Sequence, residues 1–315
     1  MENSQSGNCG CIRSLRKRLF RAYQSTLIRL GGHGFGRFSW VRKLDVFVRM
    51  RLKRRTANIL GHHMALDDLD TLNLSLEGIH EPLATEVLVA LTSSGDVVLD
   101  VGANIGYFTL LFARQAGPTG RVFAYEPEPV NFKLLARNLE LNCYKDRVVA
   151  YQKAASDEPG LAALAVVERN RGMNRLWKGP SGSTSIEVEK VVLDDNPLLF
   201  ERPINLVKID VEGWELHVLS GMKRLLKCNP QVAIFTEFTP SYLVEAGSIP
   251  VQLIELLAGQ GRQLFILKDG SKKLCRVKSS HWQHWFECEY GGLSGAQINI
   301  LSVSADSDTR RLPIE

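Results

Sequence analysis

The segment that most constrains the fold covers residues 97–106 and reads VVLDVGANIG. It is a short apolar run that carries an acid, Asp100, near its end and leads into a glycine-rich turn. Residues 107–113 then place apolar side chains at helical spacing, and a second apolar run ends in Glu126. Apolar runs of this kind are typical of buried parallel strands. The segment therefore predicts the first βαβ unit of a nucleotide-binding sheet.

The rest of the chain continues this alternation of strands and helices. We expect an α/β fold, a doubly wound and mostly parallel seven-stranded sheet of Rossmann-like type, closed by an antiparallel strand pair. Residues 157–185 hold several glycines and are expected to be irregular. The predicted strands are 97–101, 121–125, 147–151, 186–192, 205–209, 231–236, 263–267 and 298–303, and the predicted helices are 82–91, 106–115, 129–142, 213–226 and 250–259.

Composition favours an ordinary soluble enzyme domain. Hydrophobic residues make up 44% of the chain and charged residues 23%, which is usual for globular proteins. We find no run of 18 apolar residues and no secretory signal, and the six cysteines are scattered, as in proteins of a reducing compartment. We therefore expect a cytoplasmic protein, and we expect no metal site.

Positive charge is concentrated at the N-terminus. Residues 1–55 contain 14 Lys and Arg against two acids, whereas the remainder contains 25 against 32. Residues 12–30 combine this charge with apolar residues at helical spacing, which predicts a basic amphipathic helix. We expect residues 1–60 to form a partly disordered helical arm and residues 61–315 to form the catalytic domain. The arm either packs on the domain or makes peripheral contact with an anionic membrane, at the inner membrane surface. No nucleic-acid motif accompanies it.

The glycine turn suggests which nucleotide binds. Gly102 and Gly106 are spaced as G-x-x-x-G, whereas dinucleotide sites carry G-x-G-x-x-G. Asp100, just before the turn, would repel a pyrophosphate but suits a ligand with an amino group and no phosphate. Glu126 can accept hydrogen bonds from two ribose hydroxyls. These features favour S-adenosyl-L-methionine over a nicotinamide cofactor.

A second group of charged residues follows the strand predicted at 205–209. Lys208, Asp210, Glu212 and Glu215 lie within eight residues, and buried charges at a strand end are costly unless paired or used. Asp210 or Glu212 could accept a hydroxyl proton or bind the amino group of the cofactor. Lys208 could pair with them, and Glu237 ends the next strand. A structural network of ion pairs is the alternative interpretation.

Together these motifs resemble the FkbM-type S-adenosylmethionine-dependent methyltransferases. The resemblance covers about residues 62–270 and rests on DVGANIG (100–106), YEPEP (125–129), NLELN (138–142), ASD (155–157) and KIDVEG (208–213). It implies a class I methyltransferase fold and a reaction centre at the segment 210–213, which contains Asp210 and Glu212. From the residues themselves we add Lys208, as a partner of these acids, and Glu237, as a further candidate to accept the proton. We expect the cofactor-binding residues to be Asp100, Gly102, Ala103, Asn104, Gly106, Tyr107, Glu126, Ser156 and Asp157.

Known members of that family mostly methylate hydroxyls, so the resemblance implies O-methylation. The expected acceptor is a hydroxyl on a sugar, a glycolipid or a natural-product small molecule. Two alternatives remain open on the sequence alone: a nicotinamide-dependent oxidoreductase, and a non-catalytic nucleotide-binding protein at a membrane surface. The absence of a third glycine and the presence of Asp100 argue against the oxidoreductase. The acids around Asp210 argue against the non-catalytic protein.

Overall fold

The computed structural model describes residues 53–167, 174–176, 184–267, 271–277 and 297–314, together with five isolated positions before residue 53. Residues 1–52 of the predicted basic arm lie, apart from those positions, outside the described residues, so the helix expected at 12–30 and the membrane contact stay predictions. Near the end of the predicted arm, residues 56–59 form a strand and not a helix. In the described part of the chain, no helix combines the length and the apolar character needed to cross a membrane.

The chain divides into two compact units, Met1–His80 and Glu81–Glu315. The described part of the first unit is a hairpin of β1 (Thr56–Ile59) and β2 (His62–Ala65), followed by the short helix α3 (Leu74–Glu77). Leu60 and Gly61 connect the two strands with positive φ angles of 48° and 88°, which suits the tight turn of a two-residue hairpin. Sequence reasoning did not foresee this hairpin.

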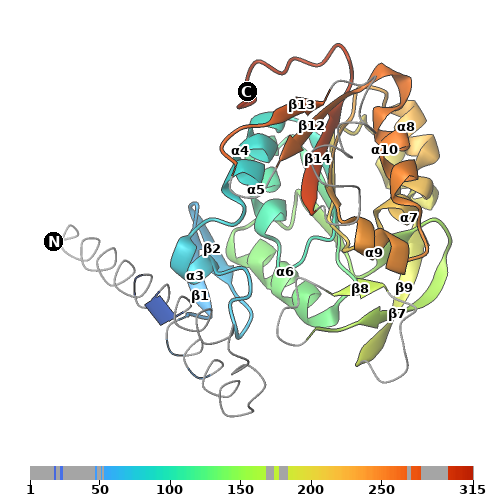
Figure 1. Ribbon diagram of the computed structural model, residues 1–315. Coiled ribbons are helices and arrows are strands. Elements are labelled where there is room, and N and C mark those ends of the chain that lie inside the picture. The colour runs from blue at the N-terminus through green and yellow to red at the C-terminus, as the bar shows by residue number, and fades with distance from the viewer. Residues whose placement is uncertain are drawn as a thin grey trace. The chain divides into compact units, whose positions relative to one another are not determined.

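The second unit is built on an eight-stranded sheet (Figure 1). Five strands pair in parallel, and at one side β14 (Ile298–Val303), β12 (Gln263–Leu267) and β13 (Cys275–Val277) make antiparallel pairs with their neighbours. The fold prediction is confirmed, with one edge strand, β13, added to the seven expected. The strand order is β13 (Cys275–Val277), β12 (Gln263–Leu267), β14 (Ile298–Val303), β11 (Ala233–Phe238), β10 (Leu206–Ile209), β3 (Val97–Val101), β4 (Arg121–Tyr125), β5 (Val148–Tyr151).

The order of the strands locates a crevice. The chain proceeds outward from β3 to β4 and β5, and then returns to add β10 and β11 on the other side of β3. The strand order therefore reverses between β3 and β10. Ligands of open α/β sheets bind at such a switch point, outside the carboxyl ends of the strands. Asp100 and Lys208 are paired across β3 and β10 near that end.

Helices cover both faces of the sheet (Figure 1). Alternate residues of a strand point to opposite faces, and Val97, Leu99 and Val101 join one core cluster with Val218 and Leu253. That core lies under α7 (Glu215–Ser220), α8 (Lys223–Cys228) and α10 (Pro250–Ala258). The remaining helices of the unit are α4 (Pro82–Leu91), α5 (Tyr107–Ala116), α6 (Pro129–Leu141) and α9 (Pro240–Glu245).

The segment expected to be irregular, residues 157–185, contains two strands, β7 (Gly160–Ala165) and β8 (Arg175–Leu176). The strand predicted at 186–192 is confirmed as β9 (Ser185–Val192). Together with β6 (Ala154–Ser156), these strands form a second, four-stranded sheet in the order β6, β9, β7, β8. The single helix expected at 213–226 is likewise two helices, α7 and α8, which are separated at Gly221. A Cβ at Gly221 would lie 1.9 Å from the backbone oxygen of Ser156. The glycine therefore lets this helical segment pack directly against β6.

Candidate active site

The glycine turn after β3 is shaped by a close approach of two strands. Gly102 has a φ of +80°, and a Cβ there would lie 1.8 Å from the backbone oxygen of Asp210. Only glycine fits both the backbone angle and the space. The backbone N–H groups of Gly102 and Ala103 donate to the oxygen of Tyr125 at 2.9 and 3.0 Å. The turn is therefore tied to β4 and lies against the end of β10.

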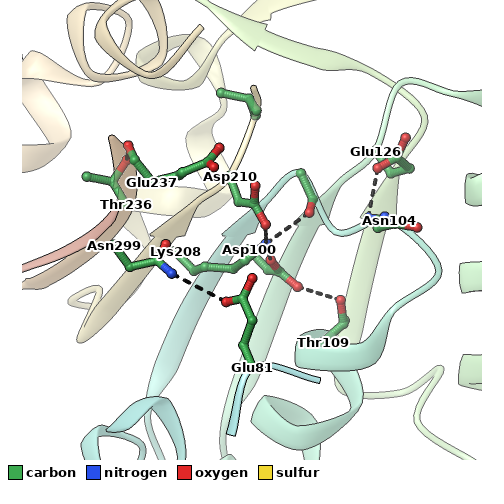
Figure 2. Close-up of polar contacts among 12 residues, drawn as sticks. Glu81, Asp100, Asn104, Thr109, Glu126, Lys208, Asp210, Thr236, Glu237 and Asn299 are labelled. Carbon is green, nitrogen blue, oxygen red and sulfur yellow. Dashed lines mark hydrogen bonds and ion pairs between the residues drawn. The ribbon is translucent and has the colours of Figure 1, made fainter. Parts of the chain in front are cut away.

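Glu126 follows β4 and holds the same turn from the other side. One carboxylate oxygen accepts from the backbone N–H of Asn104 at 2.7 Å (Figure 2). The other accepts from the backbone N–H of Glu128 at 2.9 Å. Burial raises the pKa of Glu126 to about 7, against the lowering effect of these hydrogen bonds. Each oxygen keeps capacity for a further donor, such as a ribose hydroxyl.

Lys208 is a buried cation between two acids. Its Nζ lies 3.4 Å from Asp100 Oδ1 and 3.3 Å from Asp210 Oδ2, and it donates to the backbone oxygen of Gly102 at 3.0 Å (Figure 2). Burial alone would lower the pKa of Lys208, but the charges of Asp210 and Asp100 outweigh it and raise the pKa. Asp100 has no exposed surface and accepts from Thr109 Oγ1 at 2.6 Å. Lys208 thus links the turn to the predicted reaction centre.

Asp210 also belongs to a cluster of three carboxylates. Oxygens of Asp210, Glu212 and Glu237 lie within 4.8 Å of one another, and Glu237 points toward Asp210 in Figure 2. Burial, and next the charge of Asp210, raise the pKa of Glu212 to about 8 and that of Glu237 to about 9. Glu237 accepts hydrogen bonds from Thr239 and Gln297, both at 3.2 Å. The structure therefore brings together all four residues predicted at the reaction centre.

Glu215 supports the turn that carries two of these acids. It is 1% exposed, and its Oε1 accepts from the backbone N–H groups of Val211 and Gly213. Burial raises its pKa to about 7. Glu212 has a positive φ of 54°, and Gly213 packs against the backbone of Tyr242. Non-glycine residues in that conformation often mark functional sites.

The carboxylate spacing also suits a cation. One divalent ion could contact an oxygen from each of Asp210, Glu212 and Glu237, and within the described ranges this is the one group of three potential metal ligands. The absence of a metal site stays a prediction.

A cavity of about 590 Å³ runs beside these residues. Its lining includes Gly102, Asn104 and Glu126 from the turn and Asp210 and Glu212 from the acid cluster. The cavity therefore joins the predicted cofactor residues to the predicted reaction centre.

Several predicted cofactor residues lie behind the cavity. Ala103 and Tyr107 are buried, and Tyr107 shares a 3.0 Å hydrogen bond with Thr85. A Cβ at Gly106 would lie 2.7 Å from Leu135, so this glycine allows α6 to approach the turn.

Ser156 and Asp157 also lie outside the lining and contact other side chains. Ser156 has no exposed surface and accepts from the indole of Trp214 at 3.1 Å. Asp157 lies 3.2 Å from His217. Burial acts to raise the pKa of Asp157, but the hydrogen bond from His217 and its charge lower it on balance.

Comparison with known families identifies this constellation. The family described as methyltransferase FkbM domain matches residues 100–264, which is more than half of the chain. The match begins at Asp100 and includes the acids at Asp210, Glu212 and Glu237.

The chain belongs to the methyltransferase FkbM domain family.

Several curated relatives of this FkbM-domain protein are methyltransferases by name. Methyltransferase sdnD of Sordaria araneosa is 32% identical over 164 residues, which cover 42% of this chain and 63% of that protein. The 31-O-demethyl-FK506 methyltransferase FkbM of Streptomyces tacrolimicus is 36% identical over 161 residues, covering 41% and 60%. Hexuronic acid methyltransferase AglP of Haloferax volcanii is 32% identical over 138 residues, covering 42% and 52%. The chain thus spans about half to two thirds of these relatives.

Solved structures give a more distant similarity. The O-methyltransferase from Bacillus cereus in complex with SAH aligns with a TM-score of 0.42 and 16% sequence identity, over 72% of this chain and 82% of that one.

S-adenosylmethionine could bind in the cavity of the FkbM-domain protein. Leu164, Leu176 and Trp214 lie in the lining and could form apolar walls for a base, and Glu126 could accept hydrogen bonds from a ribose. These side chains could therefore hold an adenosyl group, which carries no phosphate.

Sequence reasoning missed further residues of this site. Glu81 reaches Asn299 at 3.4 Å and adds to the negative charge around Lys208 and Glu212 (Figure 2). Glu81 has a positive φ of 42°, which no local motif signals. Arg175 lines the cavity from β8 and lies over the ring of Tyr242 at 4.3 Å. Glu81 stands just before α4 and contacts a residue 218 positions later, and Arg175 lies on a two-residue strand, so neither has a local sequence signal.

Proposed function

We propose that this protein is an S-adenosylmethionine-dependent O-methyltransferase that acts on a hydroxyl of a sugar, a glycolipid or a natural-product small molecule. The observation that carries the proposal is a cavity lined by Glu126 and by Asp210 and Glu212, two acids whose oxygens lie within 4.8 Å of one another and of Glu237. A cavity that joins a candidate cofactor residue to a cluster of carboxylates suits proton removal from a second substrate.

Different residues of the chain bind the cofactor and remove the proton. The bound cofactor supplies an electrophilic methyl group. Gly102, Asn104 and Glu126 hold its adenosyl part, and Asp210 accepts the proton that leaves the acceptor hydroxyl as the new carbon–oxygen bond forms. Lys208, at 3.3 Å from Asp210, orients that carboxylate. Positioning two bound reactants accounts for much of the acceleration in such transfers.

Asp210 is the best placed of the three carboxylates to act as the base. Glu212 and Glu237, with pKa values raised to about 8 and 9, hold protons at neutral pH. Asp210 forms an ion pair with Lys208, and its side chain is 40% exposed. It can therefore meet a hydroxyl that enters from solvent, while the protonated neighbours donate hydrogen bonds.

The acceptor class rests on the chemistry of this end of the cavity and on the names of the relatives. Carboxylates and protonated carboxyls bind hydroxyl groups well, and Asn299 and Glu81 lie close by. One relative acts on a hexuronic acid and another is an O-methyltransferase by name. Both facts favour an oxygen acceptor on a polar small molecule.

The test is methyl transfer by an Asp210→Asn variant. Labelled S-adenosylmethionine is offered with a panel of sugars, uronic acids and hydroxylated lipids to the wild-type protein, and the best acceptor is used for the variant. We expect turnover to fall by roughly a hundredfold or more, because general base catalysis contributes about that much. Affinity for S-adenosylhomocysteine is measured in parallel, so that a loss of turnover is distinguished from a loss of cofactor binding. Glu140→Gln, at an exposed position on α6, is the control, and full turnover by Asp210→Asn would exclude Asp210 as the base.

A further inference from the structure

Trp214 forms a wall of the cavity, and three other residues hold it in place. Its indole N–H donates to Ser156 Oγ at 3.1 Å, and its ring stacks on His217 with centroids 3.9 Å apart and planes at 17°. Trp214 is 6% exposed, and the cavity is lined by Trp214 but not by His217. One face of the indole is therefore covered by the imidazole, which keeps the cofactor away from His217.

His217 is itself oriented by acceptors at both ring nitrogens. Nδ1 lies 3.2 Å from Asp157 Oδ1, and Nε2 lies 3.4 Å from the backbone oxygen of Ala246. Ser156 Oγ donates to the same Asp157 oxygen at 3.0 Å. The contacts form a closed circuit: the indole donates to Ser156, Ser156 donates to Asp157, Asp157 binds His217, and His217 stacks on the indole.

This circuit depends on the close packing of α7 against β6. His217 lies on α7, and Ser156 ends β6. The two segments can come together because Gly221, just after α7, has no side chain. A Cβ at this position would lie 1.9 Å from the backbone oxygen of Ser156. A helix that stood farther from the strand would separate His217 from Asp157. The local backbone is thus arranged to bring the imidazole under the indole.

We propose that His217 is a positioning residue for the cofactor. His217 acts by fixing the plane of the Trp214 indole against the adenine base. Stacking is the contact that matters, because it sets the orientation of the ring that faces the cavity. Aromatic stacks fix relative ring orientation and add to the energy of burial. The inference rests on the cavity being the cofactor site, as argued above.

Two substitutions separate stacking from hydrogen bonding. His217→Phe keeps a ring under the indole but loses the contacts with Asp157 and Ala246. His217→Gln keeps a donor for Asp157 but loses the ring. His63→Gln, at an exposed position on β2, controls for the exchange itself. Affinity for S-adenosylhomocysteine is measured by calorimetry. The orientation of the indole is followed by near-ultraviolet circular dichroism, and the contribution of Trp214 is identified as the part of the spectrum that is lost in Trp214→Phe.

We expect His217→Gln to raise the dissociation constant roughly three- to tenfold, the range that the loss of one aromatic stack predicts, and to weaken the Trp214 dichroism. His217→Phe should bind within about twofold of wild type, because the stack remains, and should keep that signal. The proposal is overturned if His217→Gln binds like wild type, or if both variants lose affinity equally.

Two further measurements cover other outcomes. If His217→Gln does not fold, His217→Leu removes the stacked ring as well, and we expect it to weaken cofactor binding and the Trp214 dichroism; wild-type values for both would overturn the proposal. If the wild-type protein binds no S-adenosylhomocysteine, the proposed function fails. The dichroism of the two His217 variants still decides whether His217 orients the indole.

Discussion

Replacing Lys208 by Met should destabilise the protein strongly. The substitution keeps the length of the side chain but removes the cation that lies 3.4 Å from Asp100, which has no exposed surface. Removing one partner of a buried ion pair costs about 3–5 kcal/mol, because the remaining charge is left without compensation. Asp210 contributes less to this cost, since its side chain is 40% exposed and water can replace the lost partner.

A double substitution separates the charge from the packing. Asp100→Asn combined with Lys208→Met leaves no buried charge at the pair and should recover about 2 kcal/mol or more of the loss. The comparison pair is Lys145 and Glu140, 2.8 Å apart with side chains 61% and 67% exposed. Lys145→Met should change stability by less than about 1 kcal/mol.

Urea unfolding followed by circular dichroism measures these differences. With a slope of about 3 kcal/mol per molar urea, Lys208→Met should shift the midpoint by about 1–1.7 M. A shift no larger than that of Lys145→Met would refute the view that the charge of Lys208 compensates the buried charge of Asp100. Failure of the double variant to recover stability would refute the electrostatic origin of the loss.

Two further predictions concern the other acids. Glu126→Gln should weaken S-adenosylhomocysteine binding about tenfold by calorimetry, since hydrogen bonds to a charged acceptor are the stronger ones; unchanged affinity would remove its ribose role. In the wild-type protein, with the pKa of Glu126 at about 7, affinity should fall as pH drops below 7. Burial raises the pKa of Glu237 to about 9, so its folded state binds the proton more tightly than the unfolded state, and stability falls as pH rises from about 5 to 9. The melting temperature of Glu237→Gln minus that of wild type should therefore grow over this range, and a flat difference would contradict the raised pKa.

The sheet was predictable because its signals are local. The strands around Asp100 and Lys208 are apolar runs bounded by turn residues, and the structure places them as β3 and β10. Glycine spacing likewise marked the turn, although the reason Gly102 is required, the oxygen of Asp210 within 1.8 Å of a Cβ, lies more than a hundred residues away. Periodicity therefore finds the elements, but it does not show why a particular glycine is needed.

What could not be predicted depends on pairings between distant segments. The strand β7 pairs with β9, and β8 pairs with β7; neither pairing is signalled by the local sequence, which reads as irregular. Glu81 reaches Asn299 across 218 residues, and its unusual backbone angle has no local signature. Ser156 and Asp157 follow a predicted strand, but the packing of α7 turns them toward Trp214 and His217.

The central claim, a cofactor site between Glu126 and Asp210, is tested most directly by calorimetric titration of the purified protein with S-adenosylmethionine and, in parallel, with NAD. The structure predicts saturable binding of S-adenosylmethionine with one site per chain, and no binding of NAD, whose pyrophosphate has no G-x-G-x-x-G turn to receive it. Binding of NAD alone, or of neither ligand, would contradict the account.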